Sequence, residues 1–182
     1  MRKLIAHAGG TPGDVYGRQG KSFLRHKIAG YNNAAQRMPW IVLVDLDRDS
    51  DCAPPLRNAW LPQPAPHLCF RVAVREVEAW LLADAERLAR FLSVARSRLP
   101  SDPELLGDPK ATMVKLARAS RRRDIREDMV PRPGSRRQVG PAYSSRLIEF
   151  ASAHWRPDVA AGQTDSLKRA MRSLKRLVRG AA

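Results

Sequence analysis

The chain is poor in cysteine, histidine and aromatic residues, and each shortage excludes a class of site. Its 182 residues include 2 cysteines, Cys52 and Cys69, which match no metal spacing or disulfide framework and fit a reducing compartment. The 4 histidines are scattered and form no ligand pattern. Aromatic residues make up 6% of the chain and are not interleaved with its basic stretches, so stacking on single-stranded bases is not indicated.

Long apolar segments are also missing. No apolar run approaches the roughly 20 residues that span a bilayer. The segment Met1–Ala8 is too short, and too soon followed by Gly9 and Gly10, to be a signal peptide. We therefore expect a cytoplasmic protein without a membrane partner.

Acidic residues are scarce relative to basic ones. The chain has 33 Lys and Arg against 18 Asp and Glu, a formal net charge of +15 and a pI near 11.1. A surplus of this size predicts attraction to nucleic acid or to an acidic partner protein. Hydrophobic residues make up an ordinary 43%, enough for a proper core. We expect a core domain at 1–95 and a basic helical extension at 96–182.

The hydrophobic pattern alternates between strand and helix in the first half of the chain and is helical in the second. It predicts an α/β fold with a mostly parallel sheet flanked by helices, and a helical C-terminal part. Strands are expected at 4–8, 40–44 and 69–74, a basic loop at 121–141, and helices at 21–37, 77–92, 109–120, 142–155 and from residue 164 or 165 onward.

The final helix is amphipathic. Its apolar stripe consists of Leu167, Ala170, Met171, Leu174, Leu177 and Val178. Its basic face consists of Lys168, Arg169, Arg172, Lys175, Arg176 and Arg179.

The strand Ile41–Val44 ends at two carboxylates, Asp45 and Asp47. Period two would put both on the same side of an extended chain, where like charges need a cation. Mg²⁺ is the natural partner, because it prefers oxygen ligands. An EF-hand is excluded, because the loop lacks its glycine and its final glutamate. The alternative is that both residues simply end the strand and cap a turn.

A glycine-rich segment, Gly17–Ser22, precedes the first long helix. It is not a phosphate-binding Walker loop, because Val15 occupies the position of the first glycine. Arg18 and Lys21 near the positive end of a helix could still hold a phosphate of a nucleic acid. The alternative is a flexible loop.

Glu76, Glu78 and Asp84 follow the strand at 69–74. The carboxyl ends of neighbouring parallel strands meet at one sheet edge, so Glu76 or Glu78 could complete a site begun by Asp45 and Asp47. Alternatively, acids in the first turn of a helix only favour its dipole.

A further basic stretch predicts phosphate contacts without sequence preference. Its candidate nucleic-acid-binding residues are Arg121, Arg122, Arg123, Arg136 and Arg137. The alternative is a solvated surface or a face that docks an ATPase.

Three motifs together resemble the TOPRIM-like family known as domain of unknown function 4276: Val42–Asp47, Val72–Asp84 and Asp108–Lys110. The segment Glu78–Asp84 is the most specific of them. Trp155–Ala160 and Asp165–Ala170 are similar to the same pattern, so the resemblance covers nearly the whole chain.

The resemblance implies a TOPRIM fold in which Asp45 and Asp47 bind Mg²⁺ or Mn²⁺. It implies a second metal or acid–base role for Glu78, and for Lys110 the neutralisation of a transition-state phosphate. Relatives are often encoded beside AAA or ABC-type ATPases, which implies an ATPase partner and anti-phage defence. The family's catalytic first-strand Glu is absent, because no acidic residue precedes Asp14. We expect either an N-terminally incomplete chain or a catalytically weakened copy.

The predicted function is therefore a Mg²⁺-dependent nuclease that acts on nucleic-acid phosphodiesters. The alternative is a catalytically weakened TOPRIM-like adaptor that binds nucleic acid or an ATPase without cutting.

Overall fold

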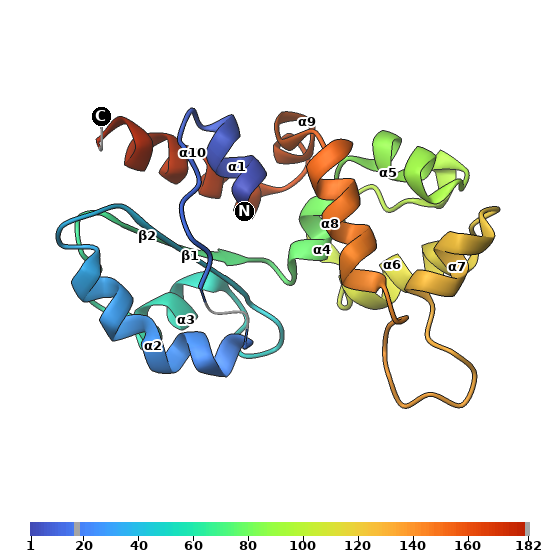
Figure 1. The fold of residues 1–182 in the computed structure, drawn as a ribbon, viewed down its shortest axis with the longest axis horizontal. Helices are drawn as coiled ribbons and strands as arrows, with labels where there is room; N and C mark the ends of the chain where they lie inside the picture. Colours follow the sequence, from blue (N-terminus) through green and yellow to red (C-terminus); the bar gives the residue numbers. More distant parts are fainter. Residues whose placement is uncertain (17–18, 181–182) are drawn as a thin grey trace. The chain divides into compact units, whose positions relative to one another are not determined.

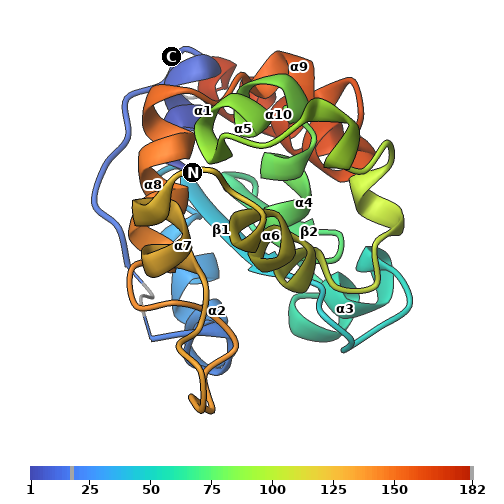
Figure 2. The same cartoon turned by 90° about the vertical axis from the view of Figure 1, so that its right-hand side faces the viewer.

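The structure is a computed structural model that describes residues 1–16 and 19–180. The chain has a mixed α/β fold with a two-stranded parallel sheet flanked by helices, and its C-terminal half is mostly helical (Figure 1, Figure 2). It divides into two compact units. Unit 1 comprises Met1–Val74 and Asp165–Ala182, and unit 2 comprises Arg75–Thr164. The expected boundary at residue 95 stays a prediction about the domains.

Unit 1 contains the sheet and four helices among its described residues. Strand β1 pairs in parallel with β2, with Trp40 opposite Leu68 and Asp45 opposite Ala73. The elements of this unit are α1 (Arg2–His7), α2 (Lys21–Ala34), β1 (Trp40–Asp45), α3 (Ala53–Trp60), β2 (Leu68–Ala73) and α10 (Asp165–Arg179).

The two faces of the sheet are covered by different helices (Figure 1). Val42 and Val44 of β1 and Phe70 and Val72 of β2 pack with side chains of α2 and α3 in one buried cluster. Helix α10 packs against β2 on the other face, and its predicted apolar stripe is buried from Leu167 to Leu174. Period two in the strands and period 3.6 in the helix produce these faces.

All of the regular secondary structure in the described residues of unit 2 is helical. Its core includes the fully buried Trp80, Leu88, Met113, Ile125 and Phe150. The elements are α4 (Val77–Leu82), α5 (Ala85–Leu92), η1 (Arg96–Arg98), η2 (Pro103–Leu105), α6 (Pro109–Arg118), α7 (Arg123–Met129), α8 (Tyr143–Ala153) and α9 (Pro157–Ala161).

Three of the expected elements were wrong. The strand expected at 4–8 is part of helix α1, which packs against α10. The helix expected at 77–92 is broken at Asp84, which is buried. The loop expected at 121–141 contains helix α7, because Ile125 and Met129, four residues apart, are both buried.

In the part of the chain that the structure describes, no helix combines the length and the apolar character needed to span a membrane.

Candidate functional site

The carboxylates predicted to hold a metal follow strand β1. Asp45 is the last residue of this strand, and Leu46 after it is fully buried. Asp47 has a φ of 52°, in the left-handed region. The extended alternation that predicts Asp45 and Asp47 on one side of the chain therefore stops at Asp45.

Lys21, the first residue of α2, reaches this turn. Its ammonium Nζ lies 2.9 Å from Asp47 Oδ2 and 2.8 Å from Asp49 Oδ2. It also donates to the carbonyl oxygen of Leu46 at 3.2 Å, so its three N–H groups have three acceptors. Burial alone lowers the pKa of Lys21, but the hydrogen bonds and charges of Asp49 and Asp47 outweigh it and raise the pKa. Lys21, predicted to hold a phosphate, holds two carboxylates here.

The contacts of Lys21 with Asp47 and Asp49 determine whether the turn can bind a metal ion. Mg²⁺ is usually bound by one or two protein carboxylates together with waters and phosphate oxygens. Asp47 and Asp49 form such a pair in type, but the ammonium of Lys21 takes the position of the cation. The described residues also include no group of three or more His, Cys, Asp or Glu placed to hold a metal ion. In this arrangement the donor set does not fit Mg²⁺ or Mn²⁺, which would have to displace Lys21.

In unit 2, Glu76 joins the starts of two helices. It immediately precedes α4, and its carboxylate accepts from the backbone N–H of Lys110 at 2.9 Å and from Lys110 Nζ at 2.6 Å. Asp108, the N-cap of α6, accepts from the Ala111 N–H at 2.7 Å. Because Pro109 has no N–H, the start of α6 leaves three N–H groups open, and Glu76 and Asp108 satisfy two of them. The motif around Lys110 has a structural role in capping α6.

Glu78 is a buried acid. Its Oε1 accepts from the Tyr143 hydroxyl at 3.1 Å and lies 3.9 Å from Lys110 Nζ. Burial raises the pKa of Glu78, and the nearby Lys110 only partly opposes this. Burial also raises the pKa of Tyr143, and the charge of Glu78 adds to the effect. The cluster could keep a proton on Glu78 at a pH where an exposed glutamate has lost it.

The segment Glu78–Asp84 forms hydrogen bonds with distant residues at two further positions, Trp80 and Asp84. Trp155 donates from its indole Nε1 to the carbonyl oxygen of Trp80 at 3.0 Å. Asp84, fully buried, accepts from the backbone N–H of Arg156 at 2.8 Å and from its guanidinium at 3.1 and 2.6 Å. The segment Glu78–Asp84 therefore connects α4 to α8 and α9.

The predicted site residues fall into two sets. Asp45, Asp47 and Lys21 belong to unit 1, whereas Glu78 and Lys110 belong to unit 2. The structure brings Lys21 to Asp47 in the first set, and Lys110 within 3.9 Å of Glu78 in the second. A single site that contains both sets stays a prediction.

The predicted basic residues of unit 2 differ in their partners. Arg122 forms an ion pair with Asp124 and lowers the pKa of that carboxyl to about 2. Arg123 pairs with Glu127 at 2.7 Å. Arg121, Arg136 and Arg137 are exposed, the last two between α7 and α8. Arg18 lies outside the described residues.

Arg146 was missed, although it contacts Asp124, Asp128 and Glu149 at 2.7–3.0 Å. Tyr143 and Arg156 were missed as partners of Glu78 and Asp84. No local signal identifies such partners, because they come from distant helices. Arg71 was missed too, and here a signal exists: it is a lone charge between Phe70 and Val72 in an apolar strand.

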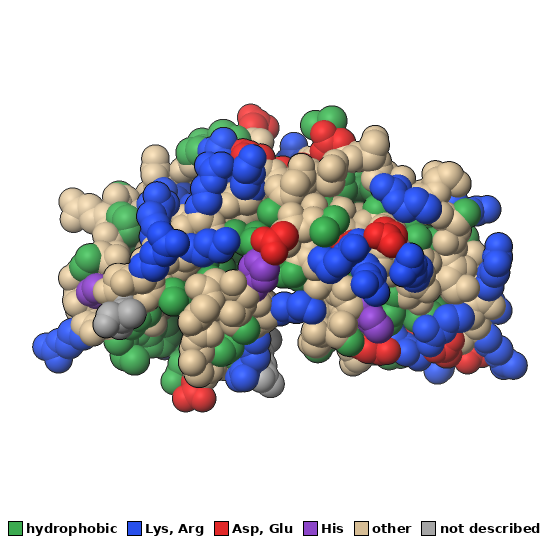
Figure 3. Space-filling model, turned by 90° about the horizontal axis from the view of Figure 1, so that it is seen from above, with side chains coloured by type: hydrophobic (Ala, Val, Ile, Leu, Met, Phe, Trp, Pro, Cys, Tyr) green, Lys and Arg blue, Asp and Glu red, His purple; other side chains and the backbone are tan. Residues whose placement is uncertain are grey.

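Helix α10 carries the densest basic surface of unit 1, and its predicted basic face is exposed along its whole length. The exposed residues are Lys168, Arg169, Arg172, Lys175, Arg176 and Arg179, with Asp165 as the single exposed acid. Asp165 pairs with Arg169 at 2.7 Å. Blue Lys and Arg side chains gather over α10 in Figure 3. We call this surface the α10 basic face.

Comparison with family models, with curated proteins and with solved structures finds no significant match to this chain.

Proposed function

We propose that this chain binds nucleic acid by contacting phosphates with the α10 basic face. The observation that carries the proposal is the exposure of six cationic side chains against one acidic side chain on a single helix. The other face of α10 is buried, so the helix is fixed with its cations outward. Cations of this kind release counterions from the phosphate backbone and give affinity without sequence preference.

The test uses charge neutralisation on one face. Lys168, Arg172 and Lys175 lie at helical spacing on α10, and we would replace all three with glutamine. The salt dependence of duplex binding, plotted as log affinity against log salt, should become shallower by about 3, roughly 0.9 per lost phosphate contact. Fluorescence anisotropy over a range of salt concentrations measures it.

A matched control removes the same charge from unit 2. Arg87, Arg90 and Arg96 are exposed, and their triple replacement by glutamine changes the net charge equally. This variant should retain nearly all of the affinity and slope. Equal losses in both triple variants would mean that only net charge matters, and the α10 interface would be rejected.

A second candidate function is Mg²⁺-dependent nuclease activity. Three carboxylates, Asp45, Asp47 and Asp49, lie at the end of β1, and two of them converge on one cation. Because the donor set does not fit a metal while Lys21 is bound, no catalytic step is assigned to one. The TOPRIM-like fold, the ATPase partner and the role in phage defence rest on the resemblance and belong to this candidate. The cytoplasmic location, expected from the two unpaired cysteines and the lack of long apolar segments, belongs to it as well.

The nuclease candidate can be tested by binding as well as by cleavage. Removing the competing ammonium in Lys21→Met should raise the affinity for Mn²⁺, measured by electron paramagnetic resonance, and Asp47→Asn in the same background should lower it again. Metal-dependent cleavage by the wild-type chain should disappear in Asp47→Asn. A metal site at this turn would be excluded if Asp47→Asn still cleaved nucleic acid, or if neither Lys21→Met nor Asp47→Asn changed the affinity for Mn²⁺.

A further inference from the structure

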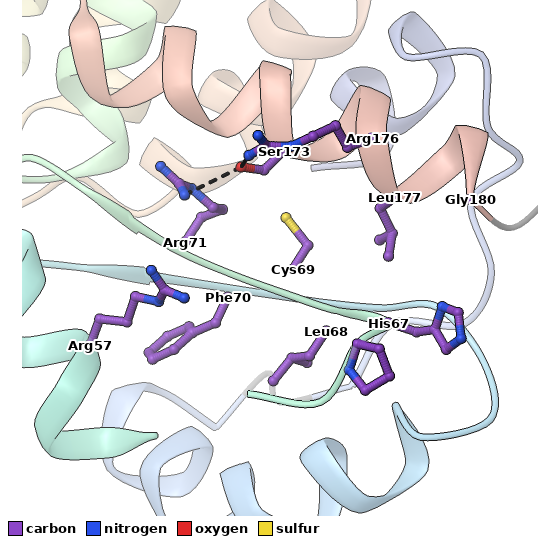
Figure 4. Close-up of a pocket in the computed structure, with 11 residues that line it drawn as sticks. Arg57, His67, Leu68, Cys69, Phe70, Arg71, Ser173, Arg176, Leu177 and Gly180 are labelled. Atoms are coloured by element: carbon purple, nitrogen blue, oxygen red, sulfur yellow. Dashed lines mark hydrogen bonds between the residues drawn. The ribbon is translucent and has the colours of Figure 1, made fainter. Parts of the chain in front are cut away.

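A pocket of about 380 Å³ follows strand β2 within unit 1 (Figure 4). Cys69 and Arg71 line it from β2, Ser173 and Arg176 from α10, and Arg57 from α3. Its volume lies in the range of small-molecule sites. Three of its lining side chains are therefore guanidinium groups.

Arg71 has an unmet hydrogen-bonding requirement. Its Nη1 donates to Ser173 Oγ at 3.3 Å, but its Nε is buried and has no partner among the described residues. Ser173 Oγ also accepts from Arg176 Nη2 at 3.3 Å, so one hydroxyl oxygen serves two guanidinium groups. A buried donor without an acceptor is costly, and an anion bound to the same guanidinium would offset part of that cost.

The pocket carries positive charge that the described residues do not neutralise. Burial lowers the pKa of Arg71, and the charges of Arg57, Arg169 and Arg176 lower it further. Cys69 does not compensate, because burial raises the pKa of its thiol to about 11 and it stays neutral. None of the carboxylates in the described part of unit 1 lines the pocket. This charge favours an anionic ligand.

Several guanidinium groups without a carboxylate suit a phosphate monoester. Arginine binds phosphate oxygens in bidentate fashion, and a terminal phosphate offers more negative charge than a backbone diester or a single carboxylate. The volume leaves room beyond one phosphate group. Arg176 belongs both to the pocket and to the α10 basic face, so a strand lying on α10 can reach the pocket with its end.

We infer that this pocket binds the terminal phosphate of a nucleic-acid strand, with Arg57, Arg71 and Arg176 as its ligands. The inference rests on the proposed function, because it specifies which part of the nucleic acid unit 1 recognises.

The test compares oligonucleotides of one sequence, internally labelled, that carry a 5′-phosphate, a 3′-phosphate or hydroxyl groups at both ends. One of the phosphorylated forms should bind about tenfold more tightly than the hydroxyl form, as expected for charge-assisted hydrogen bonds. Arg71→Gln and Arg57→Gln should remove this preference. Arg172→Gln, on α10 outside the pocket, should weaken all three forms equally.

Two variants keep the test valid if one fails to fold. Arg57 is exposed on α3, so Arg57→Gln should leave the circular dichroism spectrum and thermal midpoint unchanged. Equal affinity for all three ends would overturn the inference, as would a preference that persists in both variants. The α10 triple variant tests duplex binding, whereas Arg57→Gln and Arg71→Gln test the preference for a phosphorylated end. Failure of the proposed function and failure of this inference are therefore distinguishable.

Competitors identify the source of the anion. Inorganic phosphate should abolish the end preference while the remaining diester binding persists. If inorganic phosphate binds in an Arg71-dependent manner while none of the oligonucleotides binds, the inference would be overturned in favour of a free anion. A polyglutamate peptide that binds as tightly as the phosphorylated strand would overturn it in favour of an acidic protein partner.

Discussion

The two units use their cationic side chains differently. They have nearly equal numbers of Lys and Arg, but unit 2 has twice as many Asp and Glu. In unit 2, Arg146 contacts three carboxylates and Arg156 contacts two. In unit 1, Arg71 and Arg176 have no carboxylate partner among the described residues. The same side chain joins helices in one unit and is available to an external anion in the other.

The clusters of two acids and one lysine differ in a related way. Lys21, Asp47 and Asp49 lie at a partly exposed turn, where the side chains of the two acids are 43% and 52% exposed. Glu76, Glu78 and Lys110 lie between helices, and the side chain of Glu78 is 9% exposed. Water screens the acids of the first cluster more than those of the second, so the second should be the more important for stability.

The strongest test of unit 2 removes its most buried carboxylate. Asp84→Ala leaves the backbone N–H of Arg156 without its acceptor and leaves its guanidinium with the exposed Glu86 alone. We expect the free energy of unfolding to fall by about 3 kcal/mol, measured by urea denaturation. Glu86→Ala removes the exposed partner of the same arginine and should change stability little. Similar small effects in both variants would show that Asp84 does not hold the helices.

Glu78 should make stability depend on pH. Its pKa is raised in the folded chain, mainly by burial, so the folded state keeps a proton that the unfolded chain releases. Its contribution is therefore fully present below the unfolded pKa near 4.5 and is lost as pH rises through the folded pKa. Urea denaturation at a series of pH values should show this fall in the wild type and not in Glu78→Gln. An identical pH profile of stability in the wild type and in Glu78→Gln would refute the assignment of this pH dependence to Glu78.

The exposed cluster should contribute less. Lys21→Met removes the ammonium shared by Asp47 and Asp49, and we expect a loss below about 1 kcal/mol, because the partner carboxylates are solvated. High salt should reduce the difference in the free energy of unfolding between the wild type and Lys21→Met further. A loss as large as that of Asp84→Ala would remove the distinction between the two units.

The smallest effect is expected for Arg71. Because it has no carboxylate partner in the described structure, Arg71→Met should leave the free energy of unfolding unchanged within about 0.5 kcal/mol, or increase it. Thermal and urea denaturation measure this. A large loss of stability would show that Arg71 supports the fold of unit 1, contrary to a ligand-binding role.

Predictions from the sequence succeeded where a periodic pattern was long. Helix α10 and its two faces were predicted from 15 residues of regular spacing, and β1 from an uninterrupted apolar run. Short segments failed. Leu4 and Ile5 fit a strand as well as a helix, and only packing of α1 against α10 decides between them.

The candidate site was predictable in composition and not in pairing. The residues Asp47 and Glu78 stand out in the sequence, but their partners Lys21 and Tyr143 come from segments that are remote in the chain. Helix 77–92 breaks at Asp84, which Arg156 holds from outside the helix. Hydrogen bonds between distant segments leave no local pattern, so no reading of these segments alone could assign them.

The sequence by itself determined the excess of positive charge, the strand that leads to the aspartates and the amphipathic helix at its end. These follow from composition and from periods of two and 3.6 residues, which are local properties. Tertiary structure decided which charges are neutralised. It placed carboxylates against the arginines of unit 2 and left Arg57, Arg71 and Arg176 around a pocket without one. Because electrostatic energy depends on distance and burial, only the folded chain separates structural cations from binding cations.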